Sequence, residues 1–84
     1  MHEYHLVQSV LKTIKAKLST MPDVKKVTLI KLKLGNLKMV SKETFSETFK
    51  EVSRGTICEN AKLDIDEVMG DALIVENIEG EYKE

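Results

Sequence analysis

The sequence is poor in the residues that stabilise very small domains or mark catalytic sites. Its single cysteine, Cys58, excludes an internal disulfide and any CxxC pair, and therefore a thiolate zinc site of the usual kind. Tryptophan is absent and aromatic residues make up only 5% of the chain, so the core must be mainly aliphatic. There is no Gly-rich phosphate loop and no Ser-His-Asp pattern, so we expect that the chain is not an enzyme.

Strong charge of one sign and long apolar runs are also missing. The formal net charge is −1, which gives no overall field toward nucleic acid or a membrane surface. No apolar run approaches the length of a membrane-spanning helix. The N-terminus is polar and lacks the apolar segment of a secretory signal. We therefore expect a cytoplasmic protein without a nucleic-acid or membrane partner.

Periodic patterns predict five elements in one domain that covers residues 1–84. Apolar residues recur at helical spacing in two segments and alternate with polar residues in three others. The predicted helices are 4–19 and 42–54, and the predicted strands are 24–34, 61–68 and 72–79. The order α-β-α-β-β predicts an α+β fold, a two-layer sandwich with two helices packed on one face of a three-stranded sheet.

The first predicted strand changes its alternation part of the way along. Val27 and Leu29 fall on one face, whereas the apolar residues from Ile30 onward fall on the other. Either the strand is bulged near Leu29-Ile30, or its first half is covered on its second face as well. The pattern leaves both alternatives open.

The last two predicted strands are separated only by a short turn. Gly70 in Met69-Gly70-Asp71 suits a tight connection, so we expect 61–68 and 72–79 to form an antiparallel hairpin. The acidic tail from Gly80 is expected to fray. An apolar strand at a sheet edge is also a place where a second copy of the chain can pair, which would give a homodimer.

The first five residues hold both histidines beside the free α-amine. The α-amine of Met1, the amide nitrogen of His2 and the imidazole of His2 can bind one metal in chelate rings, at little cost in chain entropy. A deprotonated amide favours square-planar Ni(II) or Cu(II). The fourth ligand is either a group of Glu3 or the imidazole of His5, one helical turn further on. By itself, the same pattern also fits a solvated, flexible chain end.

Other charged or reactive residues have plainer explanations. Five lysines could form a nucleic-acid patch, but no aromatic side chains interleave with them, and a solvated strand face explains them better. Asp64, Asp66 and Glu67 lack the loop spacing of a hard-cation site. No motif surrounds Cys58, which we interpret as a free thiol. The five lysines are Lys25, Lys26, Lys31, Lys33 and Lys38.

The opening Met1-His2-Glu3-Tyr4, followed by Leu6-Val7-Gln8-Ser9, resembles the start of the HypA/HybF family of hydrogenase nickel-incorporation proteins. Further segments resemble that family in the same order and span nearly the whole chain. They are Lys33-Leu34-Gly35-Asn36-Leu37, Phe45 and Phe49 with Val52 and Gly55-Thr56, Leu63 to Val68, and Leu73 to Glu79.

The resemblance implies a nickel site at Met1-His2-Glu3, with His2 essential to it. It also implies delivery of Ni(II) with a HypB-type GTPase to a [NiFe]-hydrogenase or urease precursor. It does not extend to His5, which we expect to act as an auxiliary ligand. The alternative function is a metal-independent interaction module, or a homodimer formed through a sheet edge.

The sequence departs from the family at three places. Position 5, usually a small polar residue in the family, is His5 here. Family members carry a zinc-binding insertion with two CxxC motifs between the last two strands, where this sequence has only Met69-Gly70-Asp71. We therefore expect the nickel-binding domain alone, without zinc. The Glu of the family's Gly-Glu-Leu is Asn36 here.

Overall fold

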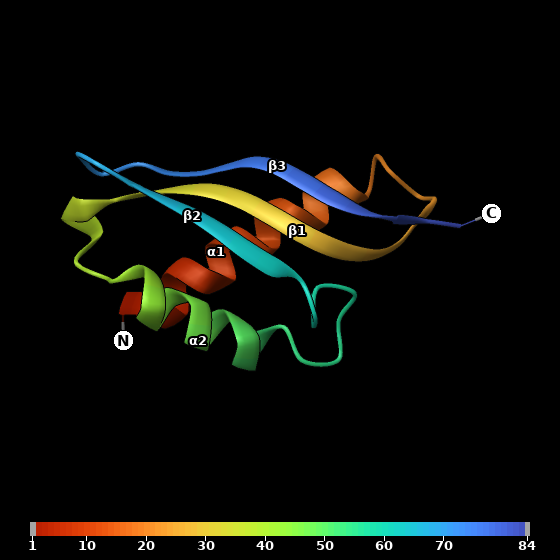
Figure 1. The fold of residues 1–84 in the computed structure, drawn as a ribbon, viewed down its shortest axis with the longest axis horizontal. Helices are drawn as coiled ribbons and strands as arrows, with labels where there is room; N and C mark the ends of the chain where they lie inside the picture. The colour runs from red at the N-terminus through yellow and green to blue at the C-terminus, as the bar shows by residue number, and fades with distance from the viewer. Residues whose placement is uncertain (1, 84) are drawn as a thin grey trace.

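The computed structural model describes residues 2–83, and the side chains of residues 4–83. Two α-helices and three strands follow one another in the predicted order α-β-α-β-β, with one short 3-10 helix after the first strand (Figure 1). The elements are α1 (His2–Leu18), β1 (Val24–Gly35), η1 (Asn36–Lys38), α2 (Lys42–Val52), β2 (Lys62–Val68) and β3 (Leu73–Tyr82). The fold is α+β, as the patterns predicted.

The sheet has the order β2-β1-β3, so β1 lies between the other two strands (Figure 1). β1 pairs in parallel with β2 and antiparallel with β3. The predicted hairpin of the last two strands is therefore wrong. Alternation shows which face of a strand is buried but not which strand lies beside it, and the connection from Val68 to Leu73 passes the end of β1. This connection crosses two strand spacings, about 10 Å, and the four residues 69–72 can span that distance.

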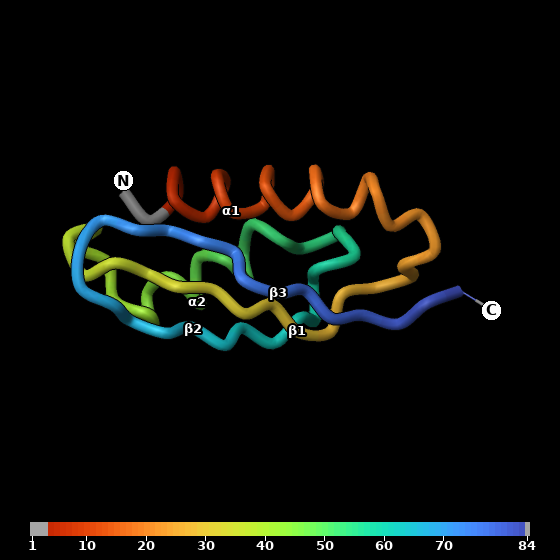
Figure 2. Tube along the Cα trace, turned by 90° about the horizontal axis from the view of Figure 1, so that it is seen from above, coloured from red at the N-terminus to blue at the C-terminus, as the bar shows by residue number. Residues whose placement is uncertain are grey.

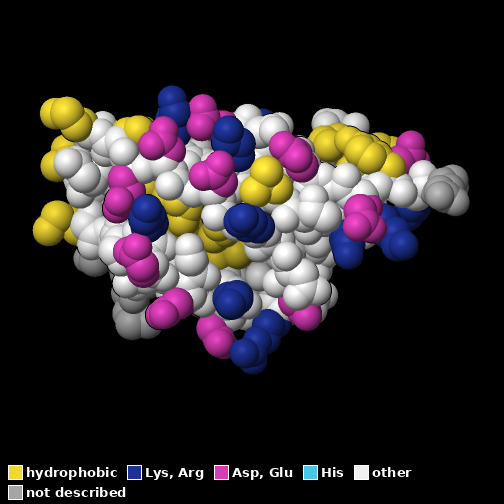
Figure 3. Space-filling model, in the orientation of Figure 1, with side chains coloured by type: hydrophobic (Ala, Val, Ile, Leu, Met, Phe, Trp, Pro, Cys, Tyr) yellow, Lys and Arg dark blue, Asp and Glu magenta, His cyan; other side chains and the backbone are white. Residues whose placement is uncertain are grey.

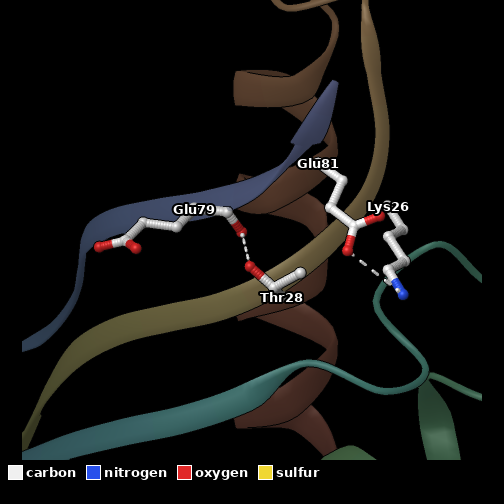
Figure 4. Close-up of polar contacts among 4 residues, drawn as sticks. All are labelled: Lys26, Thr28, Glu79 and Glu81. Carbon is white, nitrogen blue, oxygen red and sulfur yellow. Dashed lines mark hydrogen bonds and ion pairs between the residues drawn. The ribbon is translucent and has the colours of Figure 1, made fainter. Parts of the chain in front are cut away.

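The change of alternation in β1 is explained by a bulge. Val27 is aligned with Gly80 and Leu29 with Glu79, so Thr28 is an extra residue without a partner on β3. The bulge lets Val27 and Ile30 both face the helices, with 1% and 0% of their surface exposed. The Thr28 hydroxyl donates a hydrogen bond to the Glu79 carbonyl at 3.2 Å (Figure 4). The bulge lies one residue before the predicted position.

The acidic C-terminal segment does not fray at Gly80. β3 continues to Tyr82, which is aligned with Val24 at the start of β1. The backbone N–H of Lys83 donates to the Asp23 carbonyl at 2.7 Å. Lys26 lies 3.6 Å from a carboxylate oxygen of Glu81 (Figure 4). The prediction was wrong because the start of β1 offers backbone partners that a local pattern does not reveal.

The core lies between the helices and one face of the sheet, and α1 runs along that face (Figure 2). The buried stripe of α1 is centred on Val7, Val10 and Ile14. Leu11 and Leu18 are only partly buried at its margin. The remaining buried apolar residues are Val24, Val27, Ile30, Leu32 and Leu34 of β1, Phe45 and Phe49 of α2, and Cys58.

Ser41 caps the N-terminus of α2. Its side-chain oxygen accepts a hydrogen bond from the backbone N–H of Thr44 at 3.1 Å. We expect Ser41→Ala to lower the free energy of unfolding by about 1 kcal/mol, because that N–H loses its acceptor. Urea denaturation measures this loss. Ser9→Ala is the control because Ser9 is exposed inside α1, where alanine has the higher helix propensity. Equal effects of the two substitutions would contradict the cap.

Candidate metal centre

The candidate metal site lies at the N-terminal end of α1. The helix begins at His2, two residues before the predicted start. His2 and His5 therefore belong to one continuous helix and lie about one turn apart along it. Met1 and the side chains of His2 and Glu3 lie outside the described residues. Of the four predicted ligands, only the His5 side chain has a described position.

The start of a helix leaves backbone groups free for coordination. The first four N–H groups of an α-helix have no acceptor within the helix. The His2 amide is among them, so a metal that displaces its proton breaks no helical hydrogen bond. The positive end of the helix dipole favours a deprotonated amide and a carboxylate there. The same dipole lowers the affinity of the site for the metal cation.

The His5 side chain is exposed at this end of the molecule. Its ring meets the Tyr4 ring edge to face, with 6.5 Å between the centroids and 73° between the planes. His5 also lines a hollow of about 330 Å³ together with Leu6 and residues 37–39, which follow the end of β1. One face of the hollow is therefore formed by a segment that lies more than thirty residues away in the sequence.

Asn36 anchors the connection between β2 and β3 to the end of β1. Its side-chain oxygen accepts a hydrogen bond from the backbone N–H of Gly70 at 3.1 Å, and the N–H of Leu37 donates to the Gly70 carbonyl at 2.9 Å. Sequence reasoning missed this contact because its partners are 34 residues apart. The connection is thus held against the end of β1.

This end of the sheet also carries exposed apolar side chains, and several separate hydrophobic side chains are visible along the left edge of Figure 3. Leu37, Met39 and Met69 are 65%, 85% and 90% exposed. Met39 has a φ of 62°, a left-handed backbone conformation that is uncommon outside glycine. The pattern of the sequence did not identify Leu37 and Met39 as neighbours of His5.

The lysines that might have formed a nucleic-acid patch are partly neutralised. Three of the five lie close to carboxylates that belong to other segments. The pairs are Lys26–Glu81 at 3.6 Å, Lys33–Glu76 at 3.6 Å and Lys38–Asp71 at 3.2 Å. The sheet face therefore carries mixed charge, in agreement with the interpretation as a solvated face.

Acidic and cysteine side chains offer no further site of the usual kinds. Within residues 4–83, no three His, Cys, Asp or Glu side chains gather closely enough to hold a metal ion. Cys58 is a free cysteine and 3% exposed. Burial raises the pKa of the Cys58 thiol above its ordinary value of 9.0, and a hydrogen bond with Thr56 acts in the opposite direction. The thiol is therefore protonated near neutral pH, which disfavours both nucleophilic attack and metal binding.

No helix among residues 2–83 is long and apolar enough to cross a membrane. The fold defines a class of small α+β domain, a two-layer sandwich whose first helix begins at His2 and includes His5. Residues 1–74 match the family described as hydrogenase/urease nickel incorporation, metallochaperone, hypA. The chain belongs to this family, whose members are maturation factors rather than enzymes.

Several relatives named hydrogenase maturation factor HypA are similar to the chain. The relative from Methylocella silvestris is 39% identical over 71 residues, which are 84% of this chain and 62% of the relative. The relative from Legionella pneumophila is 37% identical over 73 residues, 87% of this chain and 64% of the relative. The relative from Methanocaldococcus jannaschii is 31% identical over 61 residues, 73% of this chain and 49% of the relative. The matches thus span at most about two thirds of these relatives.

A solved structure has the same fold. The solution structure of the nickel metallochaperone HypA from Helicobacter pylori matches with a TM-score of 0.66. The match covers 92% of this chain and 72% of the other, at 20% sequence identity. At this identity the likeness supports the arrangement of the elements and nothing finer.

Proposed function

We propose that this chain binds Ni(II) at its N-terminus and delivers it for the maturation of a nickel enzyme. The ligands are the α-amine of Met1 and the amide and imidazole of His2, with Glu3 or His5 in the fourth position. The observation that supports this proposal most directly is the helix start at His2, where the backbone amides have no helical acceptor. Membership in a nickel-incorporation family supports nickel as the identity of the metal.

The proposal extends to the setting in which the metal is transferred. A site built on a chain end suits delivery, because exchange of a few ligands empties it. We propose a HypB-type GTPase as partner and a [NiFe]-hydrogenase or urease precursor as recipient, in the cytoplasm. We further propose that residues 1–84 form a single nickel-binding domain that needs no zinc, since only residues 69–72 connect β2 to β3.

His2→Ala tests the site. With the chain beginning at Met1, we expect the substitution to weaken nickel binding by at least about tenfold, because it removes the imidazole that closes a chelate ring. Isothermal titration calorimetry on metal-free protein measures this change, and mass spectrometry confirms the free α-amine at Met1. An extension of a few residues before Met1 should weaken binding similarly.

His5→Ala decides between the two candidate fourth ligands. Loss of nickel affinity on His5→Ala assigns the fourth position to His5, and unchanged affinity assigns it to Glu3. Equal nickel affinity of the wild type and His2→Ala would contradict the proposed site.

A second candidate function is a metal-independent interaction module, or a homodimer formed through a sheet edge. The observation that favours it is the topology, since β2 and β3 each pair on one side only within the described sheet. The two candidates differ in their dependence on metal. If binding to the GTPase requires both nickel and His2, nickel delivery is supported. If binding or dimerisation is independent of both, the interaction module is supported.

A further inference from the structure

A groove runs between the second half of α1 and the segment that follows α2, which lie beside each other in Figure 2. Its volume is about 630 Å³, and it is open to solvent on one side. Apolar side chains form most of its walls, with Leu11 and Leu18 on one side and Val52 and Ile57 on the other. Ile57 is 43% exposed, so apolar surface faces water here.

The charges at this groove all have one sign. Lys12 and Lys15 line it, and no carboxylate does. Among the ion pairs of the described residues, none involves either lysine. The same helix carries Lys17, which is exposed but does not line the groove. An occupant that pairs with the two groove lysines must therefore be acidic along its flank.

The length of the groove indicates the form of its occupant. The lining residues of α1 extend from Gln8 to Leu18, about 15 Å at 1.5 Å per residue. That distance corresponds to about three turns of a second helix. A partner helix with apolar residues at i, i+3 or i+4, and i+7 fills such a groove with one face.

We propose that this groove docks an acidic amphipathic helix of a partner protein. The apolar face of that helix packs on Leu11, Leu18 and Ile57, and its Asp or Glu side chains pair with Lys12 and Lys15. The groove begins at Gln8, so none of residues 4–7 lines it. The partner helix and a metal at the chain end can therefore be held at the same time.

Two synthetic helical peptides of fourteen residues are suitable probes. Both carry leucines at alternating spacings of three and four, one with glutamates and the other with lysines at the remaining positions. Fluorescence anisotropy of the labelled peptides, titrated with the full chain in the absence of nickel, measures binding. We expect the acidic peptide to bind at least about tenfold more tightly than the basic one, and its affinity to fall as salt is added.

Charge-reversal variants locate the contact. We expect the double substitution Lys12→Glu and Lys15→Glu to weaken the acidic peptide by about tenfold, and the matched control Lys17→Glu by less than about twofold. Ile57→Ser should weaken both peptides, because it removes apolar wall. Circular dichroism checks that each variant is folded, and Lys15→Gln replaces the double variant if charge reversal unfolds the chain.

Three results would overturn the docking proposal. They are no binding of the acidic peptide at millimolar protein, an equal effect of Lys17→Glu and of the groove variants, and an unchanged affinity with Ile57→Ser. Because nickel is absent from this experiment, its failure leaves the proposed nickel site standing, and failure of the nickel site leaves the groove standing.

Discussion

Phe45→Ala is expected to lower the free energy of unfolding by about 4 kcal/mol. Phe45 is the largest fully buried side chain, with 0% of its surface exposed, and it packs in the core between α2 and the sheet. Alanine loses the transfer free energy of the ring and leaves a cavity that the neighbouring aliphatic side chains fill only in part. Domains of this length have about 4–12 kcal/mol of stability, so the loss is a large fraction of the total. Urea denaturation followed by circular dichroism measures it.

A surface substitution of similar size provides the control for Phe45. Met69 is 90% exposed on the connection between β2 and β3, so Met69→Ala should change stability by less than about 0.5 kcal/mol. If Phe45→Ala does not fold at all, Phe45→Leu should still fold with a smaller loss. A change below about 1 kcal/mol for Phe45→Ala would show that Phe45 does not occupy the packed core described here.

Gly35→Ala is expected to cost about 3 kcal/mol. A Cβ at this position would lie 2.4 Å from the Gly70 carbonyl oxygen and 2.6 Å from the Ala72 nitrogen, and both are backbone atoms that cannot rotate away. The φ of Gly35 is −71°, so the requirement is steric and not conformational. The substitution forces the connection between β2 and β3 off the end of β1, and the hydrogen bond from the Gly35 N–H to the Ala72 carbonyl at 2.6 Å is lost.

Gly55→Ala is the matched control for this steric argument. Gly55 has a φ of +79° and no atom within 4 Å of an added Cβ, so alanine there costs only the left-handed conformation, about 1 kcal/mol. Thermal or urea unfolding of the two variants gives the comparison. A cost for Gly35→Ala that does not exceed that of Gly55→Ala would contradict the close packing of residues 69–72 against β1.

The close backbone approach at Gly35 connects a feature of the sequence with a contact in the structure. The sequence predicts a strand that ends at residue 34, and Gly35-Asn36 belongs to a segment that resembles the family. The structure shows that the missing side chain at Gly35 allows the Gly70 backbone to lie close to it. The Asn36 side-chain oxygen accepts a hydrogen bond from the Gly70 N–H. Both residues therefore act on the short connection between β2 and β3.

The candidate metal site was predicted from chemistry that lies within five residues. An α-amine, an amide and an imidazole close their chelate rings without any long-range contact, so the local sequence suffices to suggest them. What lies around His5 could not be predicted in this way. The hollow beside it is completed by Leu37, Lys38 and Met39, which reach the chain end only because β1 ends there.

The sequence by itself determined the number, type and order of the elements, the α+β class and most of the core, because helical spacing and strand alternation report local burial. It also predicted candidate metal ligands at the chain end. Only the tertiary structure decided that β1 lies between β2 and β3, that β3 continues to Tyr82, and that a bulge at Thr28 turns both halves of β1 toward the helices. Strand neighbours, close backbone approaches and the groove beside α1 arise from contacts between distant residues, which no local pattern encodes.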